Sequence, residues 1–186
     1  FIEEKEEEKQ HIRTGVIKTD QKTSINVKLK GEQETEINGA GSKITAADER
    51  KITMNVERLE DAAIVVLAGS KAAGMTENWY YQTAKKLSER NIPFIIDIAT
   101  TDLLELSTLN PLLVKPNQAE LETLFNEKCK TEDDVINLAK RLYDRGAEHV
   151  IVSRGEHGAI MVCKTGVYIA KNPQGKLINS VGAGDS

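Results

Sequence analysis

The sequence predicts an α/β fold, namely a doubly wound and mostly parallel sheet with helices on both faces, together with a small separate β-sheet. From about residue 46 onward, short apolar runs alternate with segments whose apolar residues recur at helical spacing. Repeated strand–helix–strand units favour a parallel sheet covered by helices. In residues 15–38, by contrast, apolar and polar residues alternate with a period of two, which is typical of antiparallel strands with one dry face.

These patterns divide the chain into three parts. Residues 1–14, rich in Glu and Lys, are expected to form the solvated end of a helix of the α/β domain. Residues 15–42 form the small β-sheet, and residues 43–186 form the α/β core. Because residue 1 begins within a helix-like run and residue 186 stands where a helix should start, we expect a fragment that lacks both ends of the domain.

Each strand of the predicted core is a short apolar run. Buried strands are expected at residues 62–67, 94–98, 112–114 and 149–152, and a hairpin is expected at residues 159–169. The run at residues 62–67 is continuous, which is typical of a strand covered on both faces.

Apolar stripes and caps predict the helices between these strands. One stripe covers residues 52–59, and another covers residues 79–87 and is ended near Pro93. Thr131 is expected to cap a further helix, whose first turn is acidic and which Gly146 ends.

Composition excludes several classes of function. The chain has 186 residues, of which 39% are hydrophobic and 29% charged, and this suits one globular domain with a sizeable core. A net charge of −4 argues against a broad nucleic-acid-binding surface, and no apolar run has the length of a membrane-spanning helix. Cys129 and Cys163, the only cysteines, are expected to be free thiols in a reducing cytoplasm.

The polar residues that follow each predicted strand are the candidate site residues, because ligands of open α/β sheets bind at the carboxyl ends of the strands. After the first strand, Gly69 and Gly74 have the spacing of a P-loop, but Met75 stands where that motif requires a lysine. A Walker-type site is therefore excluded. Ser70 and Lys71 could donate to a substrate phosphate, or the segment could be a plain connecting loop.

Two more strand ends carry candidate residues. After the third strand, Asn117 and Glu120 have the spacing of a capping box, and alternatively their oxygens could hold water and Mg²⁺. After the fourth strand, residues 153–158 combine a hydroxyl with two glycines, which suits either a nucleotide contact or a plain turn. His157 in this loop is expected to be exposed to solvent.

The end of the chain, residues 180–186, places Gly182 and Gly184 around Ala183, and Asp185 follows. Small residues let backbone N–H groups approach an anion, and a helix that starts here would favour negative charge. A carboxylate beside a bound anion suits phosphoryl transfer. The same residues also suit a glycine-rich turn capped by Asp185.

Taken together and in this order, these segments resemble a known family. Residues 115–120, 152–158 and 181–186 resemble the ribokinase-like sugar kinases, in particular their phosphofructokinase B branch. Within that branch, residues 25–29 and 34–38 are similar to the 1-phosphofructokinase and tagatose-6-phosphate kinase group. The resemblance covers nearly the whole chain, and the Gly-Ala-Gly-Asp element is its most diagnostic part.

The resemblance implies a doubly wound α/β domain with a β lid over the sugar. It implies that Asp185 takes the proton from the sugar hydroxyl and that the N–H groups of Gly182, Ala183 and Gly184 form an anion hole. It also implies ATP and Mg²⁺ as cofactors, with the metal positioned by Glu120 and Asn117. The residues that it assigns to ATP are Ser153, Arg154, Gly155, Glu156, His157, Gly158, Lys115 and Asn117. The residues that it assigns to the sugar phosphate are Asn26, Gly69, Ser70 and Lys71.

This chain departs from the family pattern in the lid. Relatives usually have Thr-Arg where this chain has Thr23 and Ser24, and Ser24 cannot replace the charge or the fork of an arginine at a phosphate. Lys71 is expected to supply a compensating positive charge. Relatives also carry a sugar-binding N-terminal segment and C-terminal helices around the adenine, so the 186 residues alone are expected to have little or no kinase activity.

The function implied by the resemblance is the ATP-dependent phosphorylation of fructose 1-phosphate to fructose 1,6-bisphosphate by a cytoplasmic enzyme. Tagatose 6-phosphate and fructose 6-phosphate are alternative substrates, and a non-catalytic sugar-phosphate-binding relative is an alternative of another class. A dehydrogenase is the least favoured alternative, because no Gly-x-Gly-x-x-Gly follows the first strand. We expect no nucleic-acid or membrane partner, whereas exposed apolar faces of lid strands would favour a homodimer.

Overall fold

A computed structural model describes residues 26–30, 34–38, 43–59, 64–69, 71–98 and 101–172, and of the two strands between residues 26 and 38 it describes the backbone only. The chain divides into two compact units. One consists of Phe1–Asp61 and Lys71–Glu77, and the other of Ala62–Ser70 and Asn78–Ser186. The finer division at residues 14 and 42 stays a prediction.

The first unit contains an antiparallel pair of strands. β1 (Asn26–Lys30) pairs with β2 (Glu34–Asn38), and Val27 lies opposite Ile37. This register confirms the strands predicted there from the period of two. The segment predicted as a strand at residues 15–19 lies outside the described residues.

The first unit also contains the helix α2 (Ala46–Glu57). Its N-terminus is a capping box, in which Thr45 and Asp48 each accept a hydrogen bond from the backbone N–H of the other. The helix ends at Glu57, so Leu59, predicted to close its apolar stripe, lies beyond it and is 38% exposed.

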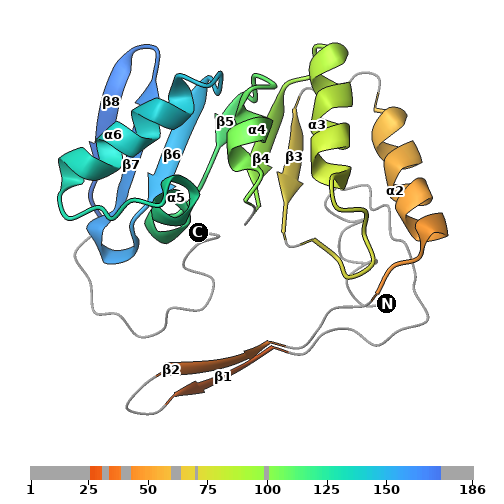
Figure 1. Cartoon of the computed structure of the whole chain (residues 1–186), viewed down its shortest axis with the longest axis horizontal. Helices are drawn as coiled ribbons and strands as arrows, with labels where there is room; N and C mark the ends of the chain where they lie inside the picture. The colour runs from red at the N-terminus through yellow and green to blue at the C-terminus, as the bar shows by residue number, and fades with distance from the viewer. Residues whose placement is uncertain are drawn as a thin grey trace, which may run out of the picture. The chain divides into compact units, whose positions relative to one another are not determined.

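The second unit is built on a six-stranded sheet in the order β3-β4-β5-β6-β7-β8 (Figure 1). Its strands are β3 (Val65–Ala68), β4 (Phe94–Asp97), β5 (Leu113–Val114), β6 (His149–Ser153), β7 (Ala159–Cys163) and β8 (Gly166–Ala170). β3 to β6 are parallel, and β7 and β8 add an antiparallel edge. The predicted strands and the predicted hairpin are therefore confirmed, except that the first strand begins at Val65 and not at residue 62, and its Val66 is exposed.

The helices of this unit connect the parallel strands. They are α3 (Trp79–Glu89), α4 (Leu103–Ser107), α5 (Gln118–Phe125) and α6 (Glu132–Tyr143). The sequence did not predict α4, because its five residues are too few to show a helical period. α6 ends before the predicted Gly146, which has a φ of 131° just beyond its C-cap, Asp144. Every helix among the described residues is too short or too polar to span a bilayer.

The described helices of this unit cover one face of its sheet. The parallel strands follow one another across the sheet without a reversal, and right-handed crossovers then place their helices on the same side. Figure 1 shows α4 and α6 in front of the strands. In β3, Val65 and Leu67 are buried, whereas Val66 is 57% exposed. The sequence predicted that β3 is covered on both faces, whereas in the described part of this unit only the face with Val65 and Leu67 is buried.

The core lies between this face and the helices, and it fixes the positions of the strand ends. Its most buried members are each at most 1% exposed: Leu87, Phe94, Ile96, Leu106, Val114, Leu121, Val135, Leu142, Val150, Val152 and Ile160. Burying such side chains contributes roughly 1.5–3 kcal/mol each. The close packing of this core therefore fixes the positions of the carboxyl ends of β4, β5 and β6.

Candidate functional site

The carboxyl ends of β5 and β6 bring two predicted segments together. Asn117 forms an isolated parallel bridge with Ser153, the last residue of β6. The N–H of Ser153 donates to the carbonyl of Pro116 at 3.1 Å, and the N–H of Lys115 donates to the carbonyl of Ile96 at 3.0 Å. The loops that start at residues 115 and 153 therefore meet at the edge where α/β sheets bind ligands.

A carboxylate that the sequence analysis overlooked lies at the same edge. Asp97 ends β4, and its Oδ1 lies 3.0 Å from Nζ of Lys115. The Asp97 side chain is 38% exposed and the Lys115 side chain 30%, so both groups remain accessible to a ligand. The signal that could have found Asp97 was present, because it is the polar residue that ends a predicted buried strand.

The N-terminus of α5 is a complete capping box. Oδ1 of Asn117 accepts from the N–H of Glu120 at 2.8 Å, and Oε2 of Glu120 accepts from the N–H of Asn117 at 2.8 Å. This confirms the capping-box interpretation of these two residues. The cap uses one carboxylate oxygen of Glu120 and leaves the other for a ligand.

The residues around this cap fit Mg²⁺ only if the ion keeps most of its water. Mg²⁺ is commonly held by one or two carboxylates together with water and substrate phosphates. In the part of the chain that the structure describes, no three His, Cys, Asp or Glu side chains gather as a metal-binding group. Glu120 and Asn117 could therefore hold the ion through water and not in a closed cage.

The loop after β6 is held in a tight conformation. It contains the 3₁₀ turn η1 (Gly155–His157), and the φ angles of Gly155 and Gly158 are +56° and +82°. A Cβ at Gly158 would collide with the carbonyl oxygen of Ala170, so the backbone requires glycine at this position, whereas at Gly155 only the positive φ favours it. The side chains of Glu156 and His157 are 89% and 67% exposed, which confirms the prediction that His157 faces solvent.

An open cavity of about 330 Å³ lies beside this loop. It is lined by Asn117, Gln118, Ala119, Glu122, Ser153, Arg154 and Gly155. Its volume is at the lower end of the range for small-molecule sites. The two sequence segments that the resemblance assigns to ATP and Mg²⁺ thus share one cavity wall.

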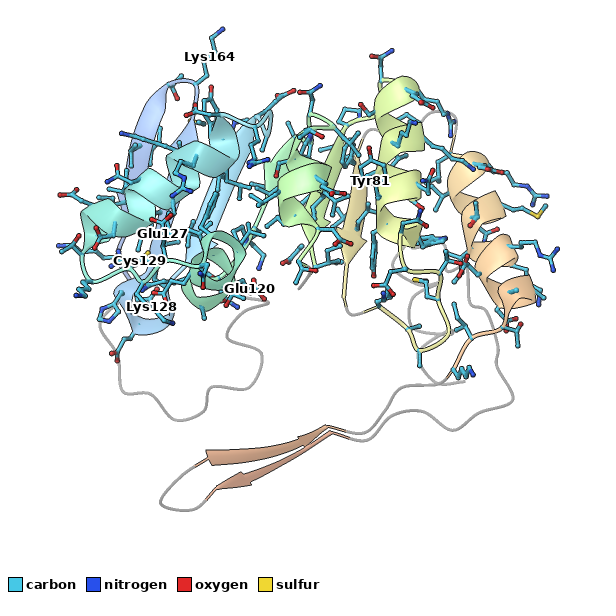
Figure 2. All side chains as sticks on the ribbon, viewed as in Figure 1. Tyr81, Glu120, Glu127, Lys128, Cys129 and Lys164 are labelled. Carbon is cyan, nitrogen blue, oxygen red and sulfur yellow. The ribbon has the colours of Figure 1, made fainter. Side chains whose placement is uncertain are left out.

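Both carboxylate oxygens of Glu122, in this wall, accept hydrogen bonds from other groups of the chain. Oε2 accepts from Nζ of Lys128 at 2.8 Å, and Oε1 accepts from Gln118 and from the N–H of Cys129. These hydrogen bonds, above all the one from Lys128, lower the pKa of Glu122 from its ordinary 4.5 to about 2. Burial raises the pKa of the Cys129 thiol. Figure 2 shows Glu120 near the start of α5, and Lys128 with Cys129 in the segment after the helix.

The remaining predicted site residues are divided between the two units. Gly69 follows β3 with a φ of +89°, a conformation that favours glycine. In the other unit, Nζ of Lys71 lies 2.9 Å from Oε1 of Glu77, and such an exposed pair is weak enough to leave Lys71 available to another anion. Of Asn26 only the backbone in β1 is described. Ser70, Gly182, Ala183, Gly184 and Asp185 lie outside the described residues.

The edge of the sheet brings together a lysine, carboxylates, a capped helix start and a glycine loop beside a cavity, which is the place where open α/β domains bind ligands. Comparison with known sequences then specifies the class. The chain belongs to the pfkB family of carbohydrate kinases. The sequence pattern of this family matches residues 4–186. The predicted resemblance to phosphofructokinase B-type kinases is therefore confirmed.

Individual relatives agree with this assignment. The chain is 40% identical over 164 residues to the 1-phosphofructokinase of Bacillus subtilis (strain 168), a match that covers 88% of the chain and 54% of the relative. It is 28% identical over 176 residues to the D-tagatose-1-phosphate kinase of Bacillus licheniformis, covering 94% of the chain and 58% of the relative. The chain thus spans little more than half the length of these relatives.

A solved structure confirms the fold. The crystal structure of phosphofructokinase-2 from Escherichia coli in complex with potassium superimposes with a TM-score of 0.84 at 27% identity. The match covers 96% of this chain and 60% of that one. The predicted α/β architecture of the ribokinase-like kinases is therefore correct.

Proposed function

We propose that this chain belongs to an ATP-dependent kinase of sugar phosphates, whose preferred substrate is fructose 1-phosphate and whose product is fructose 1,6-bisphosphate. The observation that carries the proposal is the meeting of residues 115–120 with residues 153–158 at one edge of the sheet. Open α/β sheets bind their ligands at such an edge, which suits the phosphates of ATP. The 40% identity to a 1-phosphofructokinase supports this use of the edge.

The choice of substrate is argued from the names of two relatives. Both a 1-phosphofructokinase and a D-tagatose-1-phosphate kinase act on a ketohexose that carries its phosphate on carbon 1. The higher identity to the former, 40% against 28%, favours fructose over tagatose. Tagatose 6-phosphate and fructose 6-phosphate stay as alternatives, because the Asn26 side chain and Ser70, both assigned to the sugar phosphate, are not described.

In the proposed reaction, Asp185 accepts the proton of the sugar hydroxyl. The hydroxyl oxygen forms a bond to the γ-phosphorus of ATP while the bond from that phosphorus to ADP breaks. The N–H groups of Gly182, Ala183 and Gly184 stabilise the charge on the transferred phosphoryl group. Asn117 and Glu120 would hold hydrated Mg²⁺, which would neutralise charge on the phosphates.

Lys115 and Asp97 extend this proposed machinery. The Lys115 ammonium stands at the carboxyl end of β5, where it can reach a phosphate of ATP. Asp97 lies 3.0 Å from it and orients it. In the loop after β6, the N–H groups of Ser153, Arg154, His157 and Gly158 donate to carbonyls of the chain. The Ser153 hydroxyl and the N–H groups of Gly155 and Glu156 are therefore the donors that we assign to the same phosphates.

The test is an assay of ADP release by the full-length gene product. The substrates are fructose 1-phosphate, tagatose 1-phosphate, tagatose 6-phosphate and fructose 6-phosphate, and each is repeated with Asp185→Asn. We expect the highest kcat/KM for fructose 1-phosphate and a loss of about 10²–10⁴-fold in the variant, as for other general bases. Equal turnover by wild type and variant would remove Asp185 from the mechanism.

A non-catalytic sugar-phosphate-binding protein is the second candidate. Ser24 favours it, because the arginine expected there would contact the substrate phosphate. Calorimetric binding of fructose 1-phosphate without any release of ADP would select this candidate. The homodimer through the lid and the cytoplasmic location stay predictions, and analytical ultracentrifugation of the full-length protein tests the former.

A further inference from the structure

Two helices carry, in their first turns, a glutamate that holds a loop following a strand. Oε2 of Glu132, the first residue of α6, lies 2.6 Å from Nη1 of Arg154 in the loop after β6. Glu49, in the first turn of α2, accepts hydrogen bonds from the loop after β3. Residues Lys71–Glu77 of that loop belong to the first unit together with α2. The second contact therefore concerns the loop that carries the lysine assigned to the sugar phosphate.

Glu49 binds both polar groups of one loop residue, Thr76. Oε2 of Glu49 accepts from the backbone N–H of Thr76 at 2.6 Å, and Oε1 accepts from its hydroxyl at 2.7 Å. The two residues are 27 positions apart in the sequence. Hydrogen bonds to a carboxylate are stronger than those between neutral groups, and a pair of them also fixes direction. Glu49 therefore ties the end of the loop to α2.

The middle of the loop is attached to the same helix start. The N–H of Ile44 donates to the carbonyl of Ala73 at 2.8 Å. Gly74 follows with a φ of +85°, and a Cβ there would lie 2.5 Å from the carbonyl oxygen of Ile44. Only glycine permits so close an approach. The loop is thus held against α2 at two places, by its backbone near Gly74 and by Glu49 at Thr76.

These attachments reach Lys71 through the residue that follows Thr76. That residue is Glu77, and its Oε1 lies 2.9 Å from Nζ of Lys71. The Lys71 side chain is 36% exposed. An ammonium has three donors, so it can keep Glu77 and still donate to a phosphate. A loop fixed in this way presents the lysine to a ligand with less entropy to lose on binding.

We propose that Glu49 is a positioning residue for the sugar-phosphate substrate, because it holds the loop 71–77 in the conformation in which Lys71 donates to the phosphate of the sugar. The inference rests on the proposed function, since it takes that phosphate as the ligand of Lys71. It adds a residue, Glu49, that no motif in the sequence pointed to. It also gives α2 a part in binding the substrate.

The negative charge of Glu49 separates positioning from mere proximity. A carboxylate near a phosphate repels it, so removing the charge alone would strengthen binding. Glu49→Gln removes the charge but can keep both contacts, because its amide can accept from the N–H of Thr76 and donate to the hydroxyl. Glu49→Ala removes both contacts. A positioning role therefore predicts weaker binding in Glu49→Ala and nearly normal binding in Glu49→Gln.

The experiment measures ADP release by the full-length gene product, with fructose 1-phosphate and ATP varied in turn. Lys71→Ala should raise KM for fructose 1-phosphate about 10-fold, the loss of one charge-assisted hydrogen bond. Glu49→Ala and Thr76→Val should raise it about 3–5-fold. Glu49→Gln and Thr76→Ser retain the contacts and should stay within about 2-fold of wild type. In all five variants, kcat and KM for ATP should be unchanged, because only binding of the sugar phosphate is affected.

A control and a double variant exclude a purely structural effect. Asp48→Asn removes the same charge from the neighbouring residue, whose carboxylate accepts from Thr45 and Lys51, and it should leave KM unchanged. In Lys71→Ala, the further change Glu49→Ala should have no additional effect, because Glu49 acts through Lys71. An additive rise in KM in the double variant would overturn the inference, and so would a lower KM in Glu49→Gln.

The outcomes keep the inference separate from the proposed function. If wild type phosphorylates fructose 1-phosphate and either Lys71→Ala or Glu49→Ala retains the KM of wild type, the inference fails and the kinase proposal stands. If wild type releases no ADP with any of the four sugar phosphates, both fail. Thermal unfolding verifies that each variant is folded. Thr76→Val leaves α2 intact, so it decides the question if Glu49→Ala does not fold.

Discussion

The N-termini of α5 and α6 have the same local chemistry and different surroundings. In α5 the capping box is formed by Asn117 and Glu120, and in α6 it is formed by Thr131 and Asp134. The reciprocal hydrogen bonds are 2.8 and 2.8 Å in α5, and 2.8 and 3.2 Å in α6. As helix starts the two are equivalent.

Their places in the sheet unit differ. Asn117 bridges to the last residue of β6 and lines the cavity, whereas neither Thr131 nor Asp134 lines it. α6 is a longer helix with four buried residues, and α5 has Leu121 and Glu122 only. A capping motif therefore indicates only where a helix begins. Whether the capping residues can also bind a ligand depends on whether the helix starts at the end of a strand.

The largest expected effect is on the free energy of unfolding, and it comes from truncating a buried leucine in each of the two helices. Leu121 in α5 and Leu142 in α6 are both 0% exposed, so Leu121→Ala and Leu142→Ala should each lower the free energy of unfolding by about 2–5 kcal/mol. Denaturant titration of the full-length protein measures both. Only Leu121→Ala should also weaken ATP binding below the unfolding transition, because α5 carries Asn117. Equal losses of affinity would mean that α5 has no special link to the site.

The next largest effect is on kcat/KM, and it concerns the carboxylates of the two capping boxes, Glu120 and Asp134. Glu120→Gln should lower kcat/KM by about 10–100-fold, the range typical of groups that support a metal. Asp134→Asn should leave kcat/KM within about 2-fold of wild type, since its carboxylate serves only the α6 cap. Glutamine can still complete a capping box, so stability is preserved in the first variant. If both variants kept full activity, Glu120 would serve only to cap α5, and its proposed role at Mg²⁺ would be wrong.

A smaller effect is expected when the capping side chains are removed. Asn117→Ala and Thr131→Ala should each cost about 1 kcal/mol of stability, the usual cost of losing an N-cap. Asn117→Ser, which restores a capping oxygen, should recover most of that stability without recovering activity. Thr131→Ser is the matched control and should recover stability with activity unchanged throughout. Recovery of activity by Asn117→Ser would indicate that the cap alone explains the residue.

The smallest effect concerns pH and the segment that joins the two helices. Because the folded-state pKa of Glu122 is lowered from 4.5 to about 2, its hydrogen bonds contribute stability above pH 4.5. That contribution is lost as the pH falls from about 4.5 towards 2. Glu122→Gln should therefore unfold at a lower temperature than wild type at pH 7, and the difference should shrink in acid. A difference that is constant from pH 7 to pH 3 would contradict the assignment of this shift to Glu122.

Local pattern was sufficient for most elements of the fold. The buried strands, the hairpin and the caps at Thr131 and Asn117 all depend on residues within a few positions of one another, so the sequence displays them directly. α4 was missed because it is shorter than two helical turns. The exposure of Val66 in β3 could not be foreseen, because a continuous apolar run is compatible with either one buried face or two.

The candidate site was predictable as a set of strand ends and not as a set of contacts. Lys115, Asn117 and Ser153 were identified because each stands just after a predicted strand or at its end, and the structure brings them to one edge. Asp97 fulfilled the same rule and was overlooked. Glu132 followed no rule of this kind, since it begins a helix and is connected to the site only through Arg154.

By itself, the sequence determined most of the strands and helices, the caps of α5 and α6, and the family that the strand-end motifs resemble. These features depend on neighbouring residues, whose periodicity and capping chemistry are fixed by backbone geometry. Only the tertiary structure decided that Asp97 meets Lys115, that Glu132 meets Arg154 and that Glu122 is enclosed by its own loop. The physical reason is that the order of strands in the sheet sets which distant side chains become neighbours, and that order follows from the packing of the whole unit.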